Sequence, residues 1–189
     1  MTDSTGIIQS TFLHNDYENE MLPMGERNFY ESGENLLYSE IFNNRIYKYS
    51  EGGLNPILEI DMGKYSLPDD FWEVDLMEGF SRLQENGFAT FKAAFEDGSH
   101  FLVNIHIQGK AGSFKKLLLI NKDNGSSSYW DGTSSEEGLY SDPIAMENGE
   151  ILFLTYYSVL KDHMGEKLPA NLEEKSYDYP VLLTTKINE

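Results

Sequence analysis

The sequence predicts an all-β protein made of short antiparallel sheets, of the kind that form the blades of a β-propeller. Aromatic residues make up 13% of the 189 residues, with 12 Tyr and 11 Phe, and such side chains favour strands over helices. The 16 Gly residues suit a fold with many tight turns. Between these turns short stretches with strand character recur, and four in succession make one blade.

The stretch 27–63 is the clearest blade. Turns rich in Gly and Asn separate its four expected strands, which are Asn28–Tyr30, Leu36–Glu40, Arg45–Tyr49 and Pro56–Met62. Side chains alternate along the third strand, so that Ile46 and Tyr47 point to opposite faces. A single blade cannot bury both of its faces, so this stretch needs a neighbouring blade.

The pattern changes after this blade, where residues 67–78 are expected to form a short helical insertion on the rim. Pro68 suits the first turn of a helix, because its missing N–H costs nothing there. Asp69 and Asp70 follow it, where the helix dipole favours negative charge. A second insertion, helical or irregular, is expected over 158–176.

A second blade is predicted over 81–132. Its four strands are expected at Phe88–Phe95, Phe101–Gln108, Phe114–Asn121 and Ser126–Trp130. The turn 96–99 between the first two of them carries the Asp-Gly signal. The third strand contains the continuous apolar run Leu117–Ile120, which is typical of a central buried strand. The two blades resemble each other in pattern and not in identical residues.

A third blade over 139–189 is expected to be incomplete. Two strands, Tyr140–Met146 and Glu150–Tyr157, surround an Asn-Gly turn, and a last strand follows at Asp178–Ile187. One strand of four is therefore missing. The stretch 7–12 is a candidate for it, because the last blade of a closed propeller is commonly completed from the other end of the chain. Alternatively, 7–12 is the last strand of a preceding blade.

Several short motifs occur in an order that resembles a family of bacterial six-bladed β-propellers, which includes predicted lipoproteins of gut bacteria. The segment Ile60–Pro68 matches the family pattern (I/L)DFGKYxLP, with Met62 in place of the usual Phe. Asn121–Gly125 matches a hairpin of the family, and Asp178–Leu182 matches its DNPVL motif. The segment Leu139–Ile144 matches only loosely, since a glycine pair is absent.

This resemblance covers roughly residues 27–189. Members of the family are about twice as long and carry an export signal, so the chain resembles their C-terminal half. The resemblance implies a propeller fold and a periplasmic or cell-surface location. The family has no settled activity, and so the resemblance implies no catalytic residues.

Charge excludes some partners. Lys and Arg number 14 and Asp and Glu number 32, which gives a net charge of −18. Phosphate backbones and anionic membrane surfaces repel such a chain, so we expect no nucleic-acid partner. No apolar run approaches the roughly 18 residues that span a bilayer, so no membrane span is expected.

The absence of Cys excludes disulfides, thiolate zinc sites and thiol nucleophiles. The N-terminal sequence MTDSTGIIQSTF has no basic segment and no long apolar core, so it does not resemble a signal peptide. We therefore expect either a cytoplasmic protein, if this is the full native chain, or a chain that starts after an export signal.

Aromatic residues near strand ends are the first candidates for a binding site. Trp72, Trp130, Tyr156 and Tyr157 have side chains that stack on sugars or peptides when they lie at a propeller rim. The competing interpretation is packing between blades, since sheets that face each other need large side chains.

Carboxylates of the predicted rim helix are the second candidates. Two carboxylates at a suitable distance support glycoside hydrolysis, and a cluster of them binds calcium. The alternative is a solvated helix face with favourable N-terminal charge. The residues are Asp69, Asp70, Glu73, Asp75 and Glu78.

The histidines do not predict a metal site. None of the four, which are His14, His100, His106 and His163, has the spacing of a helical metal motif. His100 and His106 lie on one expected strand and so are about 20 Å apart. No metal and no cofactor are predicted.

These observations leave three functional hypotheses. We favour a binding or interaction module, without catalysis, for a small molecule, a glycan or a protein. The alternative is a carbohydrate-active hydrolase or lyase that uses the rim carboxylates, and the third is a structural fragment without activity of its own. Half a propeller exposes two blade faces, so we expect a homodimer or a missing N-terminal half to complete the ring.

Overall fold

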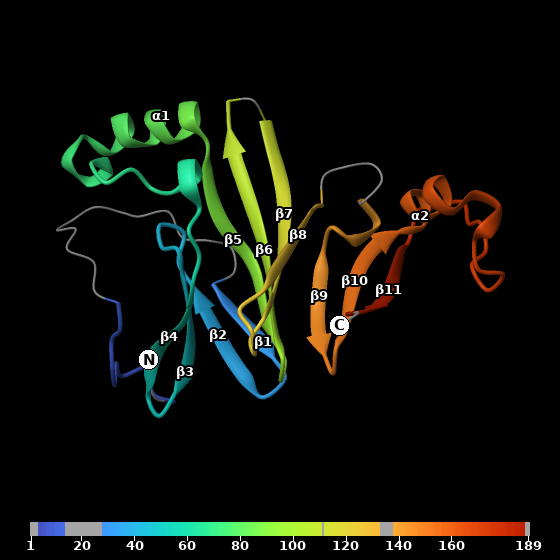
Figure 1. The fold of residues 1–189 in the computed structure, drawn as a ribbon, viewed down its shortest axis with the longest axis horizontal. Helices are drawn as coiled ribbons and strands as arrows, with labels where there is room; N and C mark the ends of the chain where they lie inside the picture. Colours follow the sequence, from blue (N-terminus) through green and yellow to red (C-terminus); the bar gives the residue numbers. More distant parts are fainter. Residues whose placement is uncertain (1–3, 14–27, 111, 133–137, 188–189) are drawn as a thin grey trace.

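The computed structural model describes residues 4–13, 28–110, 112–132 and 138–187, which form three antiparallel sheets side by side (Figure 1). In each sheet, strands that are consecutive in the chain pair with each other. The first sheet contains β1 (Phe29–Ser32), β2 (Asn35–Ser39), β3 (Arg45–Ser50) and β4 (Gly53–Glu59). The second contains β5 (Phe88–Glu96), β6 (His100–Gly109), β7 (Gly112–Asn121) and β8 (Ser127–Asp131).

The third sheet has three strands among the described residues, which are β9 (Pro143–Glu147), β10 (Glu150–Tyr156) and β11 (Pro180–Lys186). The central strand β10 pairs with both others. The predicted all-β architecture of successive blades is thus confirmed, including the shorter third sheet.

Apolar side chains fill the two spaces between blades. Tyr30 and Ile46 of the first sheet pack with Val103 of the second, and all three are almost completely buried. Leu117 of the second sheet packs in the same way with Phe153 of the third. The first strands of the three sheets also meet, since β5 contacts both β1 and β9. The blades are therefore held together face to face and along their first strands.

A helical insertion follows the first blade, as predicted, but its α-helix begins later than residue 67. The 3₁₀ turns η1 (Gly63–Tyr65) and η2 (Phe71–Glu73) come first, and α1 (Leu76–Asn86) follows. Asp75 is its N-cap and accepts a hydrogen bond from the Met77 N–H at 2.9 Å. Buried Phe71 is placed by η2 and not by the helix. A good capping residue decided the start more strongly than Pro68 did.

The second insertion contains α2 (Tyr157–Met164) and the 3₁₀ turn η4 (Gly165–Lys167), and a further turn, η3 (Gly138–Tyr140), precedes β9. The helix lies at the far end of the third sheet (Figure 1). Leu160 and Tyr157 of α2 are buried against Leu139 and Val181. Among the described residues, no helix combines the length and the apolar character needed to cross a membrane.

The fourth strand of the first blade lies three residues earlier than the expected span 56–62. Glu51 and Gly52 both have positive φ, 52° and 78°, so the turn is tight and Gly53 already pairs with Ser50. Beyond the strand, Asp61 Oδ1 accepts a hydrogen bond from the Gly63 N–H at 2.7 Å and bends the chain. The tight turn before the strand and the Asp61 hydrogen bond after it therefore set the two ends of this strand.

The stretch 7–12 does not form the predicted strand. Ile8 makes one isolated bridge, and Phe12 packs edge-on against Tyr49 of β3 with ring centres 6.4 Å apart. Contact with Tyr49 places this stretch beside the first blade, at the opposite end of the molecule from β11 (Figure 1). It therefore does not complete the third sheet of its own chain.

Candidate functional site

Three hairpins end on the same side of the molecule. They join β1 to β2, β5 to β6 and β9 to β10, and all three lie at the bottom of Figure 1, away from α1. In the third hairpin Asn148 and Gly149 have φ of 53° and 74°, which is the type I′ turn that matches the twist of paired strands. The turns bring equivalent positions of three blades together.

These hairpins surround a hollow of about 630 Å³. Its volume lies within the range of sites for small ligands. Glu34 of the first blade, Asp97 of the second and Glu147 of the third all line it. Most of the described residues that line it have polar side chains, and none of them is Phe, Tyr or Trp.

A pair of hydrogen bonds joins the first blade to the second beside the hollow. Ser32 Oγ donates to the Glu96 carbonyl oxygen at 2.7 Å and accepts from the Glu96 N–H at 2.6 Å. Ser32 is buried, so these bonds are protected from water. They fasten the end of β1 to the end of β5 across 64 residues of sequence.

The Glu96 carboxylate is surrounded by donors from two blades. Lys122 Nζ donates to Oε1 at 2.7 Å, Asn35 Nδ2 donates to Oε2 at 3.2 Å, and Lys48 Nζ lies 3.5 Å from Oε2. Lys122 also donates to the Asp97 carbonyl oxygen at 2.9 Å. Both oxygens of this buried carboxylate are thus occupied, which fixes its position.

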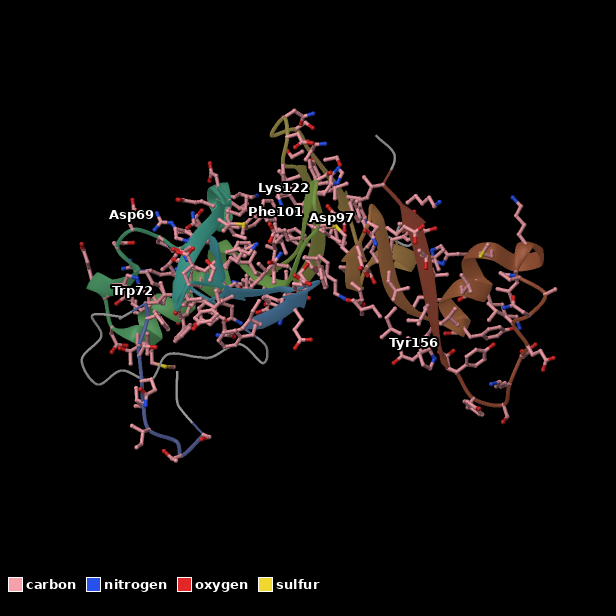
Figure 2. The ribbon with its side chains drawn as sticks, turned by 90° about the horizontal axis from the view of Figure 1, so that it is seen from below. Asp69, Trp72, Asp97, Phe101, Lys122 and Tyr156 are labelled. Carbon is pink, nitrogen blue, oxygen red and sulfur yellow. The ribbon has the colours of Figure 1, made fainter. Side chains whose placement is uncertain are left out.

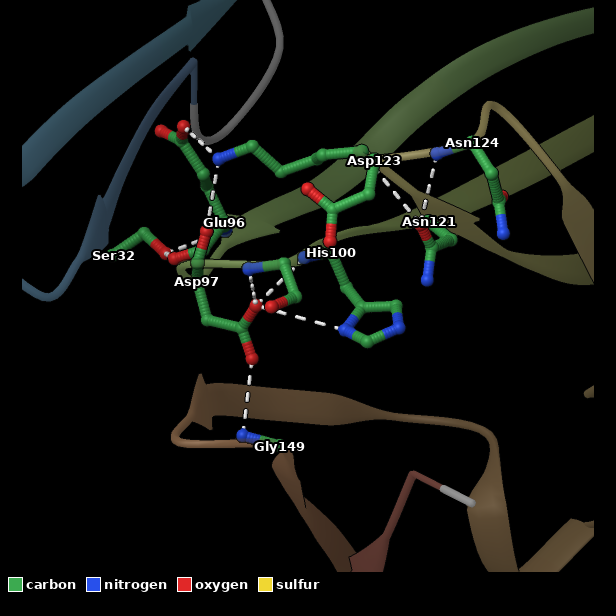
Figure 3. A network of polar contacts seen from close by, with 10 residues as sticks. Ser32, Glu96, Asp97, His100, Asn121, Asp123, Asn124 and Gly149 are labelled. Atoms are coloured by element: carbon green, nitrogen blue, oxygen red, sulfur yellow. Dashed lines mark hydrogen bonds and ion pairs between the residues drawn. The ribbon is translucent and has the colours of Figure 1, made fainter. Parts of the chain in front are cut away.

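Asp97 joins the second blade to the third (Figure 3). Its Oδ1 accepts from the N–H groups of Ser99 at 2.8 Å and His100 at 2.7 Å, and its Oδ2 accepts from the Gly149 N–H at 3.1 Å. Burial alone would raise the pKa of Asp97, but the three backbone donors and the nearby His100 hold that pKa below its usual value. The carboxylate therefore stays charged and keeps both turns in place.

His100 is the one polar side chain of the hollow's described lining that is both buried and lacks a hydrogen bond. It is 7% exposed, and its Nδ1 lies 3.8 Å from Asp97 Oδ1, beyond hydrogen-bond distance. A buried polar atom without a partner costs free energy. This nitrogen faces the Asp97 carboxylate and has almost no accessible surface of its own.

Two further carboxylates point to the solvent side of the hollow. Glu34 and Glu147 are exposed and make no ion pair or hydrogen bond with the described residues. They differ from Glu96 and Asp97, whose oxygens are all occupied. The hollow therefore has a fixed polar floor and an acidic entrance.

Comparison with known proteins agrees with this architecture. A family model described as a six-bladed β-propeller matches residues 1–138, which is more than half of the chain. The chain belongs to this family of six-bladed β-propellers. No curated protein matches the sequence of this propeller chain.

The fold is also similar to the crystal structure of a predicted exported protein from Bacteroides fragilis. The TM-score is 0.67 and the sequence identity is 12%, so the likeness concerns the fold alone. It covers 98% of the propeller chain and 56% of the Bacteroides protein. The propeller chain therefore spans about half the length of that protein.

The four aromatic residues predicted to bind a ligand are not brought together. Trp72 packs on Phe71 with ring centres 4.5 Å apart, on the turn η2 that contacts α1. Trp130 Nε1 donates to the Tyr140 carbonyl oxygen at 3.1 Å, between the second and third blades. Figure 2 shows Trp72 and Tyr156 far apart, with Asp97 between them.

The neighbouring tyrosines of the third blade differ in their surroundings. Tyr156 is 51% exposed, whereas Tyr157 is buried and stacks on Tyr179 with ring centres 5.0 Å apart. None of the four predicted aromatic residues lines the hollow, and their role in binding stays a prediction.

The predicted rim carboxylates are largely engaged in local structure. Arg82 Nη1 donates to Asp70 at 2.8 Å, and its Nη2 donates to Glu78 at 2.6 Å. Asp75 caps α1. Asp69 lines a different hollow, of about 250 Å³, beside the loop 41–44 of the first blade.

No group of three or more His, Asp or Glu side chains in the described part of the chain is arranged to hold a metal ion. His106 lies on β6 away from His100, and burial together with Lys92 and Lys115 lowers its pKa. His14 falls outside the described residues.

The hairpin site was missed in the sequence, although a signal for it exists. Glu-x-Gly occurs in each first hairpin, at 31–33, 96–98 and 147–149, and also elsewhere in the chain, at 51–53, 85–87 and 136–138. In the first two hairpins this motif places Ser32 and Asp97 at the equivalent closing position. The motif alone therefore does not identify the residues that meet near the axis, but its position in the first turn of each blade does.

Proposed function

We propose that this propeller chain is a binding module whose ligand occupies the hollow formed by the three first hairpins. The observation that carries the proposal is the hollow of about 630 Å³ itself, which is lined by polar side chains from all three blades.

Preorganisation supports binding at this place. The bonds of Ser32 to Glu96 and of Asp97 to Gly149 hold three turns in fixed positions before any ligand arrives. A rigid site loses little conformational entropy when a ligand binds, so more of the interaction energy appears as affinity.

The chemistry of the lining indicates the class of ligand. Glu34 and Glu147 provide acceptors at the entrance, and Asn148 adds an amide. Such a site suits a polar ligand with many hydrogen-bond donors. We propose the hydroxyl groups of a glycan as the first class, and basic peptides as the second.

The same lining favours binding over hydrolysis. A glycoside hydrolase needs one carboxylic acid with a raised pKa to protonate the leaving group. Asp97 has a lowered pKa, and both Glu96 oxygens are occupied by Lys and Asn side chains. These two acids are suited to holding hairpins in place.

We also propose a location outside the cytoplasm and a single domain composed of the blades 27–63, 81–132 and 139–189. The location is supported by the description of the Bacteroides relative as a predicted exported protein. The single domain is supported by the buried contacts that join each sheet to the next.

A screen of the purified chain against a glycan array and a set of Lys-rich peptides tests the ligand site. Calorimetry then gives the affinity of each hit for the wild type and for Glu34→Gln and Glu147→Gln. We expect each substitution to weaken binding about tenfold, because a hydrogen bond to a charged group contributes roughly 1.5–3 kcal/mol.

Glu73→Gln, on the 3₁₀ turn η2 far from the hollow, is the matched control and should leave affinity unchanged. The absence of hits in both ligand classes would contradict the proposal. So would hits whose affinity is the same in all three variants.

A further inference from the structure

We propose a second binding site, near the start of β5, for a small organic cation. The ligand is an amine whose charge is carried by a compact apolar body, such as a single aromatic ring. The site is the hollow of about 250 Å³ beside the loop 41–44, which Asp69 lines. It is separate from the hollow between the hairpins and does not depend on the function proposed there.

The length of β5 separates the two hollows. Its first residue, Phe88, lines the smaller hollow, whereas its last residue, Glu96, lines the larger one. Eight residue steps along a strand span about 27 Å, so a small ligand in one hollow does not reach the other. In Figure 2 Asp69 and Trp72 lie toward one end of the molecule, away from Asp97.

The walls of the smaller hollow are largely apolar. Phe42 and Phe88 are half-buried and have ring centres 5.7 Å apart, so both keep some accessible surface. A dry cavity of about 150 Å³ already holds benzene, so this hollow has room for one ring and a short polar chain. Six of the ten described residues that line it are apolar, and they are Ile41, Phe42, Met62, Leu67, Phe88 and Ala89.

The aromatic wall is held in place from behind. The ring centre of Phe42 lies 5.4 Å from that of Phe71, 5.5 Å from that of Trp72 and 6.0 Å from that of Phe80. Phe71 is 1% exposed, so this cluster is anchored in the packed interior. The wall is therefore preorganised, and a ligand that packs against it immobilises few side chains.

The amide nitrogens of the loop 41–44 are engaged within the first blade. Asn43 Nδ2 donates to the Tyr47 hydroxyl at 3.0 Å, and Asn44 Nδ2 donates to Glu59 Oε1 at 3.5 Å. The polar groups that remain to a ligand are therefore mainly oxygen acceptors. Such a lining suits a ligand that donates hydrogen bonds.

Asp69 adds a negative charge that has no counter-ion within the described part of the chain. It is exposed and makes no hydrogen bond or ion pair there. Arg82 of the same insertion is held by Asp70 at 2.8 Å and by Glu78 at 2.6 Å. The described lining contains no Lys, Arg or His, and the net charge of −18 further attracts cations.

An aromatic wall beside a carboxylate selects for positive charge. Ring faces attract a cation within about 6 Å of their centre, and a carboxylate accepts a charge-assisted hydrogen bond from an ammonium group. A neutral ligand of the same shape gains the apolar contact alone, whereas an anion is repelled by Asp69. We therefore expect affinity to fall in the order cation, neutral molecule, anion.

Benzylamine, benzyl alcohol and benzoate test this order, because they share one ring and differ in charge at pH 7. Calorimetry on the full chain at low ionic strength measures their affinities. We expect a dissociation constant of about 1 mM for benzylamine, which is reasonable for so small a ligand. Benzyl alcohol should bind more weakly, and benzoate should not bind.

Asp69→Asn removes the charge and keeps the size of the side chain. We expect the benzylamine affinity to fall about tenfold, because a hydrogen bond to a charged group is lost, and the benzyl alcohol affinity to stay the same. Asp69 is exposed, so the fold is preserved. Glu73→Gln removes an equal charge from η2, outside the described lining, and should leave the benzylamine affinity unchanged.

Trp72 reports where the ligand binds, since its ring packs directly on that of Phe42 in the wall. The chain contains two Trp residues, so in a Trp130→Phe variant the Trp emission comes from Trp72 alone. We expect benzylamine to change this emission with the dissociation constant that calorimetry gives.

The absence of benzylamine binding would overturn the proposal, and so would equal affinities for benzylamine and benzyl alcohol. An unchanged benzylamine affinity in Asp69→Asn, or binding that leaves the Trp72 emission constant, would contradict this location. Glu34→Gln and Glu147→Gln should not alter benzylamine binding at this site. Failure here is therefore distinguishable from failure of the site between the hairpins.

Discussion

Asp97 connects two blades through its carboxylate. The side chain accepts three backbone N–H groups, two from its own turn and one from Gly149 of the third blade. Charged acceptors make stronger hydrogen bonds than neutral ones, and burial removes competing water. At the scale of single residues, the polar floor of the hollow depends on this group.

Asp97→Asn should lower the free energy of unfolding by about 2 kcal/mol, because the amide keeps one acceptor oxygen and turns an NH₂ group toward a donor. Urea unfolding at pH 7 measures the change. Asp123→Asn in the exposed turn after β7 is the control, and should stay within about 0.5 kcal/mol of wild type. Equal effects of the two substitutions would argue against a special role for Asp97.

Lowering the pH should reduce the stability of the folded state in two separate pH ranges. The pKa of His106 is lowered in the folded state by burial and by Lys92 and Lys115, so the unfolded chain binds the proton more readily. Stability is therefore lost as pH falls below about 6.5. The pKa of Asp97 is also lowered, and its contribution is complete above about 3.9 and is lost as pH falls through the folded-state pKa.

His106→Gln separates these two ranges. We expect the variant to lose less stability than wild type between pH 7 and pH 5, and to lose the same amount below pH 4. Urea midpoints measured across this pH series provide the comparison. A parallel pH profile for the two proteins would show that His106 is not responsible for the upper range.

At the scale of elements, the first hairpins of the second and third blades occupy equivalent positions but form different kinds of turn. The third hairpin uses positive φ at Asn148 and Gly149, whereas the second uses the Asp97 side chain to bind the turn, and Gly98 there has an ordinary φ. Two different kinds of turn thus bring the Gly149 N–H and the Asp97 carboxylate together across the hollow.

Gly149→Ala should cost about 1 kcal/mol, because its φ of 74° is unfavourable for a residue with a Cβ atom. No atom lies within 4 Å of the added Cβ, so strain and not collision is the cause. Gly98→Ala is a matched control, since its Cβ also meets open space but its φ is not positive. We expect the midpoint temperature of thermal unfolding to be clearly lower for Gly149→Ala than for Gly98→Ala.

At the scale of the whole molecule, stability depends on the contacts between blades. Phe153 has no exposed surface and packs with Leu117 across the second interface. Each sheet contributes one face to such a contact, so no blade is expected to fold independently of its neighbour.

Phe153→Ala should lower the free energy of unfolding by about 4 kcal/mol, through lost apolar contact and the cavity that remains. Met77→Ala, at a residue 73% exposed, should change it by less than about 0.5 kcal/mol. Denaturant unfolding monitored by Trp fluorescence distinguishes them. A loss below about 1 kcal/mol for Phe153→Ala would mean that the blades do not stabilise each other.

Local sequence determined which residues form strands and where most turns lie. The strand around Ile46 and the Asn-Gly turn at 148–149 depend on neighbours a few residues apart, and both were predicted correctly. The helix after the first blade begins later than predicted, because Pro68 and Asp75 offer competing starts and the cap at Asp75 sets the observed one.

Only the tertiary structure decided which residues meet in the candidate site. Ser32 meets Glu96 across 64 residues, and Asp97 meets Gly149 across 52, so no local pattern records either contact. The stretch 7–12 shows the same limit, since its strand character is local while its position beside Tyr49 depends on blade packing. Strand propensity acts within a few residues, whereas burial and hydrogen bonding between blades depend on which faces meet.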